Sequence, residues 1–210
     1  MSNAGSFTLG GSSLESITPR QFGYWSVRWA HDNTLGQLET LLNKKNNVFP
    51  FVNSIREIQF PAYLQFLALH AASYWTYAVL VLVVEVPAIH EMGIGMDDAL
   101  KEIGDPDGKP FSEDLKSLFK KSFATYYKSI TDDFRAGSDP RVYDPDINNV
   151  AKIAVHIFSQ FYPDLKITSA NADDDAQVNI DRHFLGNMVA DVTPSLYKIL
   201  RDDIGLGYRR

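Results

Sequence analysis

Residues 16–33 read SITPRQFGYWSVRWAHDN and contain the first pattern in the chain that is typical of a helix. Thr18-Pro19 is a helix start, because a threonine oxygen caps free amide groups and proline fits the first helical turn. Large aromatic residues then recur at helical spacing, and they are Phe22, Trp25 and Trp29. We therefore expect an opening helix whose aromatic side chains share one face.

Similar patterns along the chain predict an all-α protein. Asp144-Pro145 and Thr193-Pro194 repeat the helix start of Thr18-Pro19. Ser112 caps the clearest helix, whose apolar residues hold one face from Leu115 to Phe134. Helices are also expected over 34–42 (capped by Thr34), 54–59, 61–78, 97–103, 145–161, 174–190 and 194–203. The expected architecture is a helical bundle with a flexible N-terminal arm.

The most apolar run, AVLVLVV at residues 78–84, predicts either the end of a buried helix or a strand. Glu85 and Pro87 follow at once, so the run is too short to span a bilayer as a helix. We expect a buried core segment and no association with a membrane.

Composition predicts one folded domain. A chain of 210 residues with 45% hydrophobic residues suffices for one substantial core. The Gly- and Ser-rich residues 1–15 predict a flexible arm, and residues 16–210 a single helical domain. The absence of cysteine excludes disulfides and thiolate zinc sites. The net charge of -6 argues against a broad basic surface, so any nucleic-acid contact must use a local strip.

No pattern in the sequence indicates an enzyme, a cofactor or a metal ion. His90-Glu91 lacks the second histidine four residues on that a zinc protease requires. The five histidines are scattered, which is typical of packed or solvated side chains. The segment 105–108 resembles the middle of a calcium-binding loop but lacks the first ligand, so a surface turn is the better interpretation.

Two charged clusters allow a functional interpretation beside a structural one. Asp173, Asp174 and Asp175 begin a predicted helix, where carboxylates favour the helix dipole. Crowded carboxylates also repel until protons, calcium or a partner neutralise them. Arg135 and Arg141 flank a predicted turn and could bind a phosphate, although solvated surface arginines are the commoner case.

Two stretches resemble the coat proteins of tobamoviruses, the subunits of rod-shaped plant viruses. The first stretch contains Ser16-Ile-Thr-Pro19, Gln21-Phe22, Ser26 and Trp29-Ala30. The second contains Asp174-Asp-Ala176, Val178 and Ile180, and is similar to the start of the family's RNA-proximal helix. Asn171-Ala172 replaces the arginine pair of that helix, and the arginine that follows the isoleucine is displaced to Arg182.

The resemblance implies a viral coat protein that self-assembles into a helical capsid around single-stranded RNA, in the virion and in the host cytoplasm. The expected RNA-binding residues are then Arg135, Arg141 and Arg182, and the expected carboxylate switch is Asp173, Asp174 and Asp175. The alternatives are a small helical ligand-binding protein or enzyme, with an aromatic pocket lined by Trp25, Tyr74 and Trp75, and an adaptor that uses an exposed aromatic patch.

Overall fold

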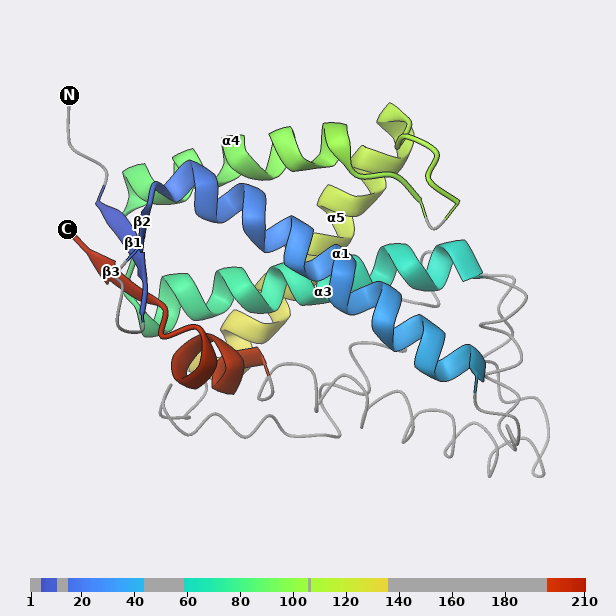
Figure 1. The fold of residues 1–210 in the computed structure, drawn as a ribbon. Coiled ribbons are helices and arrows are strands. Elements are labelled where there is room, and N and C mark those ends of the chain that lie inside the picture. Colours follow the sequence, from blue (N-terminus) through green and yellow to red (C-terminus); the bar gives the residue numbers. More distant parts are fainter. Residues whose placement is uncertain (1–4, 11–14, 44–58, 106, 136–195) are drawn as a thin grey trace.

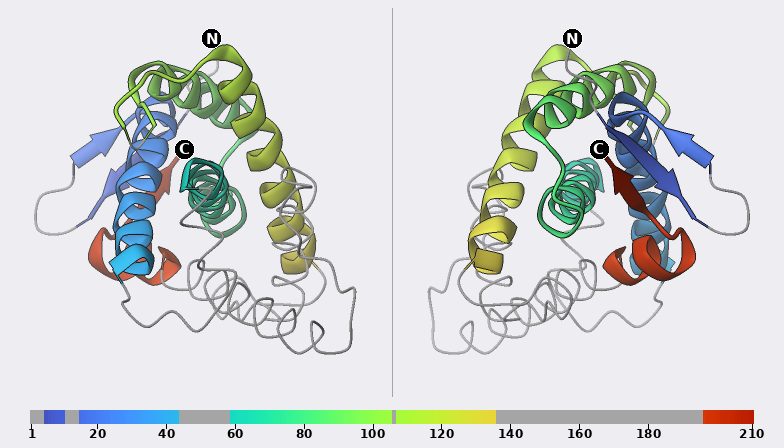
Figure 2. Two further views of the ribbon diagram at one scale, coloured as in Figure 1. Left: turned by 90° about the vertical axis from the view of Figure 1, so that its right-hand side faces the viewer. Right: turned by 90° about the vertical axis from the view of Figure 1, so that its left-hand side faces the viewer.

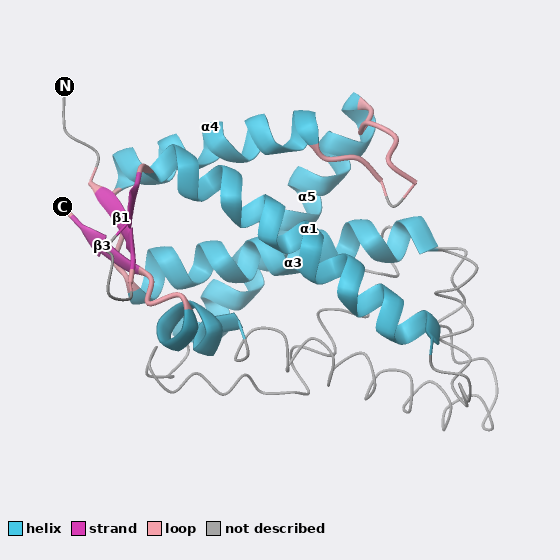
Figure 3. Ribbon diagram, in the orientation of Figure 1, coloured by secondary structure: helices cyan, strands magenta, loops and turns pink. Residues whose placement is uncertain are grey.

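The computed structural model describes residues 5–10, 15–43, 59–105, 107–135 and 196–210, and this part is mostly helical. Figure 3 shows helices over most of it, with the strands gathered at one end. The long helices are α1 (Pro19–Asn43), α3 (Gln59–Thr76), α4 (Val86–Glu102) and α5 (Glu113–Arg135). The remaining elements are the π-helices η1 (Tyr77–Val81) and η3 (Ile199–Asp203) and the strands β1 (Ser6–Leu9), β2 (Glu15–Ile17) and β3 (Gly207–Arg209).

Helix α3 lies at the centre of the helices. Figure 2 shows it between α1 and α5, with α4 along the top. Every residue from Tyr63 to Ala78 is buried. The segment Tyr63–Val81 is long and apolar enough to cross a membrane, with a mean hydropathy of 1.2, but 83% of it is buried inside the protein. Such burial is typical of the core helix of a globular protein.

Polar side chains on the buried helix α3 are paired with its neighbours, mainly α1. Tyr63 OH lies 2.6 Å from His31 Nδ1, and the amide of Asn33 donates to Tyr74 OH at 2.6 Å. The indole of Trp75 donates to Ser26 Oγ at 3.1 Å. On the other side, Gln65 Nε2 donates to Ser122 Oγ of α5 at 3.0 Å. Since buried polar groups are costly without partners, these pairs favour one arrangement of the helices.

The predicted start of the first helix is confirmed, but its predicted end is wrong. Gln21 N donates to Thr18 Oγ1 at 3.2 Å, and Thr18 N donates to Gln21 Oε1 at 2.7 Å, so the two residues form a capping box. Helix α1 then continues to Asn43 without a break. Thr34 caps no second helix, because its buried hydroxyl lies 2.9 Å from Nδ1 of His70 on α3.

The expected single aromatic face of this helix is wrong as well. Phe22 is fully buried and Trp29 is partly buried, whereas Trp25 is 43% exposed. The buried row of α1 contains Phe22, Ser26 and Ala30, which are four residues apart and therefore lie one above the other. Trp25 lies off that row, so its indole is left at the surface.

The apolar run at 78–84 belongs to neither a regular α-helix nor a strand. Helix α3 ends in the π-helix η1, and Val83 then adopts a positive φ of 54° before α4 begins at Val86. The prediction of a short helix over 97–103 places the first residue of the helix too late. Helix α4 runs from Val86 to Glu102, with Pro87 in its first turn. Packing against α1 extends this helix over residues whose local signal is weak.

The predictions for the turn at 105–108 and for the helix after it are confirmed. Oδ1 of Asp105 accepts hydrogen bonds from the amides of Asp107 and Lys109, both at 2.9 Å, and Gly108 has a φ of 77°. The carboxylate thus stabilises a surface turn. Leu115 N donates to Ser112 Oγ at 3.3 Å, so Ser112 caps α5. The buried side of α5 includes Phe119, Ser122, Tyr126 and Ile130.

The structure does not confirm the flexible arm expected over residues 1–15. Ser6–Leu9 is the central strand of a sheet with the order β2-β1-β3, and both of its neighbours are antiparallel to it. Phe7 is fully buried and stacks on Phe22 with 4.1 Å between ring centroids. This burial anchors the N-terminal strand to the helices. Because the described residues include a three-stranded sheet, the fold is mostly helical rather than all-α. The strands near the two chain ends lie side by side (Figure 1).

Several predicted elements lie outside the described residues. They are the arm residues 1–4 and 11–14, most of the helix expected over 54–59, and the helices expected over 145–161 and 174–190. The last predicted helix, towards Asp203, is described from Leu196 and ends in η3.

Acid should destabilise the protein through His70, which is 1% exposed. Burial lowers the pKa of His70 from 6.5 to about 4. Between these values the unfolded chain binds a proton that the folded chain does not. His70 should therefore contribute a fall of about 1.4 kcal/mol in the free energy of unfolding for each pH unit as the pH decreases through this window. Urea unfolding as a function of pH measures this slope.

The variant His70→Gln removes the titrating group and keeps a polar partner for Thr34. We expect its stability to depend less on pH in the same window. His90→Gln is the matched control, because it makes the same substitution at an exposed residue of α4. Equal slopes in the unmodified protein and His70→Gln would contradict the prediction.

Candidate functional site

Two pockets flank the C-terminal half of α4, one against α5 and one against α1. The α4–α5 cleft has a volume of about 390 Å³ and the polar lining residues Asp97, Lys101, Glu113, Lys116, Ser117 and Lys120, with Leu100 beside them. The α1–α4 pocket has a volume of about 370 Å³ and includes Thr18, Arg20, Tyr24, Asp98, Lys101 and Glu102. Lys101 borders both.

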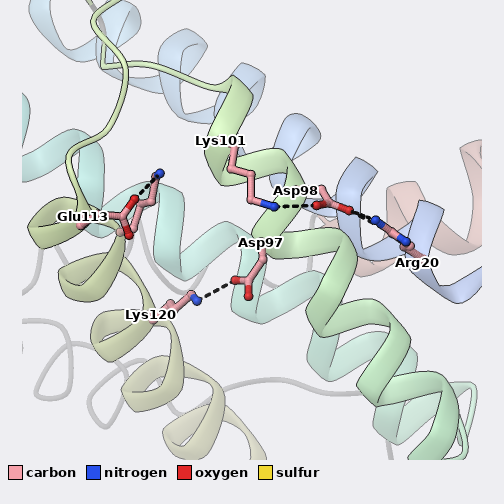
Figure 4. A network of polar contacts seen from close by, with 7 residues as sticks. Arg20, Asp97, Asp98, Lys101, Glu113 and Lys120 are labelled. Carbon is pink, nitrogen blue, oxygen red and sulfur yellow. Dashed lines mark hydrogen bonds and ion pairs between the residues drawn. The ribbon is translucent and has the colours of Figure 1, made fainter.

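Helical spacing places the charged residues of the α4–α5 cleft in two rows. Asp97 and Lys101 are four residues apart on α4, so they lie on the same face of that helix. On α5, Glu113, Lys116 and Lys120 follow one another at spacings of three and four, and they form the opposite wall. Figure 4 shows the two helices side by side, with Lys120 of α5 directed toward Asp97 of α4.

Ion pairs connect the cleft residues (Figure 4). Lys120 Nζ lies 2.7 Å from Asp97 Oδ1, a pair that joins α5 to α4. Lys116 Nζ lies 2.7 Å from Glu113 Oε1 within α5, and this lysine lowers the pKa of the Glu113 carboxyl. The side chains of Lys120 and Asp97 are 48% and 46% exposed, so water weakens their attraction, although Oδ1 of Asp97 is itself buried. The pair thus adds little stability and is easily exchanged.

Closed polar pairs occupy the α1–α4 pocket. Arg20 Nε donates to Asp98 Oδ2 at 2.9 Å, and Lys101 Nζ donates to Asp98 Oδ1 at 3.0 Å. The hydrogen bond from Arg20, followed by that from Lys101, lowers the pKa of Asp98. Tyr24 OH donates to Glu102 Oε2 at 2.5 Å, and this bond raises the pKa of the tyrosine. The Arg20–Asp98 and Tyr24–Glu102 pairs join α1 to α4, whereas the Lys101–Asp98 pair lies within α4.

The charged residues of the cleft lining decide which kinds of ligand suit it. Its lining has three lysine ammonium groups and two carboxylates, an excess of one positive charge, and Lys101 is also paired with Asp98 outside the lining. Its lining residues include no histidine that could act as a base near neutral pH. Within the part of the chain that the structure describes, no group of three histidine, aspartate or glutamate side chains could hold a metal ion.

Of the expected RNA-binding and switch residues, the structure describes only the backbone of Arg135. Arg135 is the last residue of α5. The others lie outside the described residues, and they are Arg141, Arg182, Asp173, Asp174 and Asp175. The two roles expected for these residues, RNA contact and a carboxylate switch, therefore stay predictions.

The aromatic residues expected to line a pocket lie in different environments. Tyr74 is 2% exposed and Trp75 is 5% exposed, and both make hydrogen bonds within the core. Trp25 is at the surface, where its ring meets that of Tyr24 edge to face at 5.5 Å. Tyr74 and Trp75 are thus core side chains, and they do not open a shared pocket with Trp25.

The sequence contained a partial signal for the cleft. The lysines of α5 recur on the side of that helix away from its apolar face, and charged residues in such a position are usually solvated. The predicted helix over 97–103 included Asp97 and Lys101, but no pattern in the sequence placed that helix opposite α5. No family model, no curated protein and no solved structure matches the chain.

Proposed function

We propose that this chain is the coat protein of a rod-shaped or filamentous plant virus, a subunit that assembles into a helical particle around single-stranded RNA. In this proposal it is a structural protein of the virion and of the host cytoplasm. Arg135, Arg141 and Arg182 contact the RNA, and Asp173, Asp174 and Asp175 act as the carboxylate switch.

The observation that carries the proposal is the surface position of Trp25. This residue lies in the stretch that resembles the family, on a helix whose other side is buried in the core. A tryptophan that is 43% exposed, beside Tyr24, presents a large apolar surface to water. Aromatic side chains of this kind are enriched at the centres of subunit contacts.

A helical capsid also requires a rigid subunit whose contact surfaces differ from each other, so that the array does not close on itself. The buried helix α3, with polar pairs to α1 and α5, supports such a rigid core. A few cationic contacts per subunit suffice for RNA binding, because the array multiplies them. An acidic chain with a net charge of -6 is compatible with this mode of binding.

The unmodified protein should form particles whose size depends on concentration, salt and pH. Trp25→Ser should remain folded and should raise the concentration required for assembly by more than about tenfold, since an aromatic residue at a contact centre contributes at least that much. Sedimentation and electron microscopy measure particle size and the concentration required for assembly. They are carried out with and without single-stranded RNA, over about pH 5 to 8.

Val86→Ser is the matched control, because Val86 is an apolar residue of α4 with 80% exposure and lies outside the stretch that carries the resemblance. Its assembly should equal that of the unmodified protein. A protein that stays monomeric under all these conditions would reject the coat-protein proposal. Assembly that is equally insensitive to both substitutions would reject the role of Trp25.

A further inference from the structure

The α4–α5 cleft concentrates positive charge on a chain that is acidic overall. The net charge of the chain is -6, yet the cleft combines three lysines with two carboxylates. Lys101 lies on α4, where its ammonium is paired with Asp98 (Figure 4), and Lys116 and Lys120 lie on α5. Such convergence of like charges from separate helices raises the local positive potential, which attracts anions.

The ion pairs of the cleft allow the lysines to change partners. The side chain of Glu113 is 89% exposed, although its partner Lys116 is only 20% exposed. Lys116 is therefore positioned by the cleft, whereas the carboxylate that it meets is almost wholly in water. Exposed ion pairs of this kind stabilise a fold little. A ligand that supplies more negative charge can accordingly take the place of Glu113 at low cost.

The shape of the cleft suits a small ligand. Its volume of about 390 Å³ is within the range of about 300–1,000 Å³ that is usual for small-molecule sites. Ser117 adds a hydroxyl group to the lining, and Leu100 adds apolar surface. A phosphate group has close to two negative charges and three acceptor oxygens, whereas each carboxylate in the cleft has one charge and two oxygens.

We propose that the α4–α5 cleft binds a phosphate group of an anionic ligand, with Lys101, Lys116 and Lys120 as its contacts. The lysine ammoniums leave their carboxylate partners and donate hydrogen bonds to the phosphate oxygens. The phosphate belongs either to a free polyphosphate or to the backbone of single-stranded RNA. The site lies within one subunit, so it requires no assembly and goes beyond the proposed function.

Calorimetry at low ionic strength, with inorganic pyrophosphate and with single-stranded RNA as separate probes, tests the site. Lys120→Gln should weaken binding by about tenfold, because a charge-assisted hydrogen bond contributes about that factor. Lys128→Gln is the matched control. Lys128 lies on the same helix and is also paired with an aspartate, Asp132, but it lies outside the lining of the cleft. Its affinity should stay within about twofold of the unmodified protein.

A gain of affinity provides the second test, which loss of folding cannot mimic. Glu113→Gln removes the exposed carboxylate that competes for Lys116 and should strengthen binding by several fold, roughly three to ten. Asp132→Asn makes the same change of charge on α5 outside the cleft and should have little effect. The difference between these two variants separates a local site from general attraction to the protein.

The two probes distinguish the source of the phosphate. Binding of pyrophosphate that depends on Lys120 and Glu113 supports the proposal and assigns a free polyphosphate. Binding of RNA alone, with the same dependence, supports it and assigns the nucleic-acid backbone. Failure of both probes to bind, or equal effects of the cleft variants and their controls, overturns it. Because monomers suffice for these measurements, the result is independent of whether the protein assembles.

Discussion

Gly95→Ala should lower the free energy of unfolding by about 3 kcal/mol, at the upper end of the usual cost of overpacking a core. A β-carbon at Gly95 would lie 1.9 Å from the carbonyl oxygen of Arg20 and 2.8 Å from the amide nitrogen of Tyr24. Both atoms belong to the backbone of α1, so no side-chain rotation relieves the contact. Helices α1 and α4 would have to separate along their whole crossing.

The same crossing has a second glycine, Gly23 of α1, whose added β-carbon would lie 2.0 Å from the carbonyl oxygen of Met92. Each helix thus provides one glycine at the point where the other comes closest. Small residues are what allow two helix backbones to approach so closely. The close approach also sets the distance at which Arg20 reaches Asp98 and Tyr24 reaches Glu102.

Gly93→Ala is the matched control for Gly95→Ala. Gly93 lies two residues away on the same helix, and an added β-carbon there meets no atom within 4 Å. Alanine is the better helix former, so this variant should gain about 0.5–1 kcal/mol. Urea unfolding measures both changes. If the two alanine variants changed stability alike, the close crossing of α1 and α4 would be wrong.

Phe22→Ala should lower the free energy of unfolding by about 4 kcal/mol, which is typical for removal of a buried phenylalanine. Phe22 is fully buried, stacks on Phe7 of β1 and meets Trp29 at 6.4 Å between ring centroids. The truncation leaves a cavity between the sheet and α1. It should therefore also loosen β1, and hydrogen exchange of the β1 amides measures this second effect.

Trp25→Ala, three residues further on, is the control for Phe22→Ala. It removes a larger side chain, but one that is 43% exposed, and should cost about 1 kcal/mol or less. Chemical denaturation of the two variants compares the stability lost with a buried ring to that lost with an exposed ring. A loss for Phe22→Ala no greater than that for Trp25→Ala would contradict the packing of the sheet on α1.

Local patterns in the sequence were sufficient for three features of the fold. The capping box of Thr18 and Gln21, the cap at Ser112 and the turn at Asp105 each depend on hydrogen bonds between residues two to four positions apart. Their geometry is therefore determined within a few residues of chain. The apolar face of α5 could be predicted for the same reason, since one helical period repeats along it.

Contacts between residues far apart in the sequence decided the other features of the fold. Thr34 has the chemistry of a helix cap, but His70, thirty-six positions away, provides a partner inside the fold and α1 continues past it. The glycines at 93 and 95 weaken the local helix signal of α4, and packing against α1 restores the helix. Strand β1 requires β3, at the other end of the chain, as its neighbour.

In the candidate site, too, some features depend on local patterns in the sequence and others on contacts between distant residues. The sequence by itself determined that lysines recur along one side of α5 and that Asp97 and Lys101 share a helical face. Only the tertiary structure placed those two rows on opposite walls of one cleft, because the crossing of α4 over the helical core sets the distance between them. Charge is a property of each residue, whereas a binding site depends on the distances between residues of separate helices, and packing of the core determines those distances.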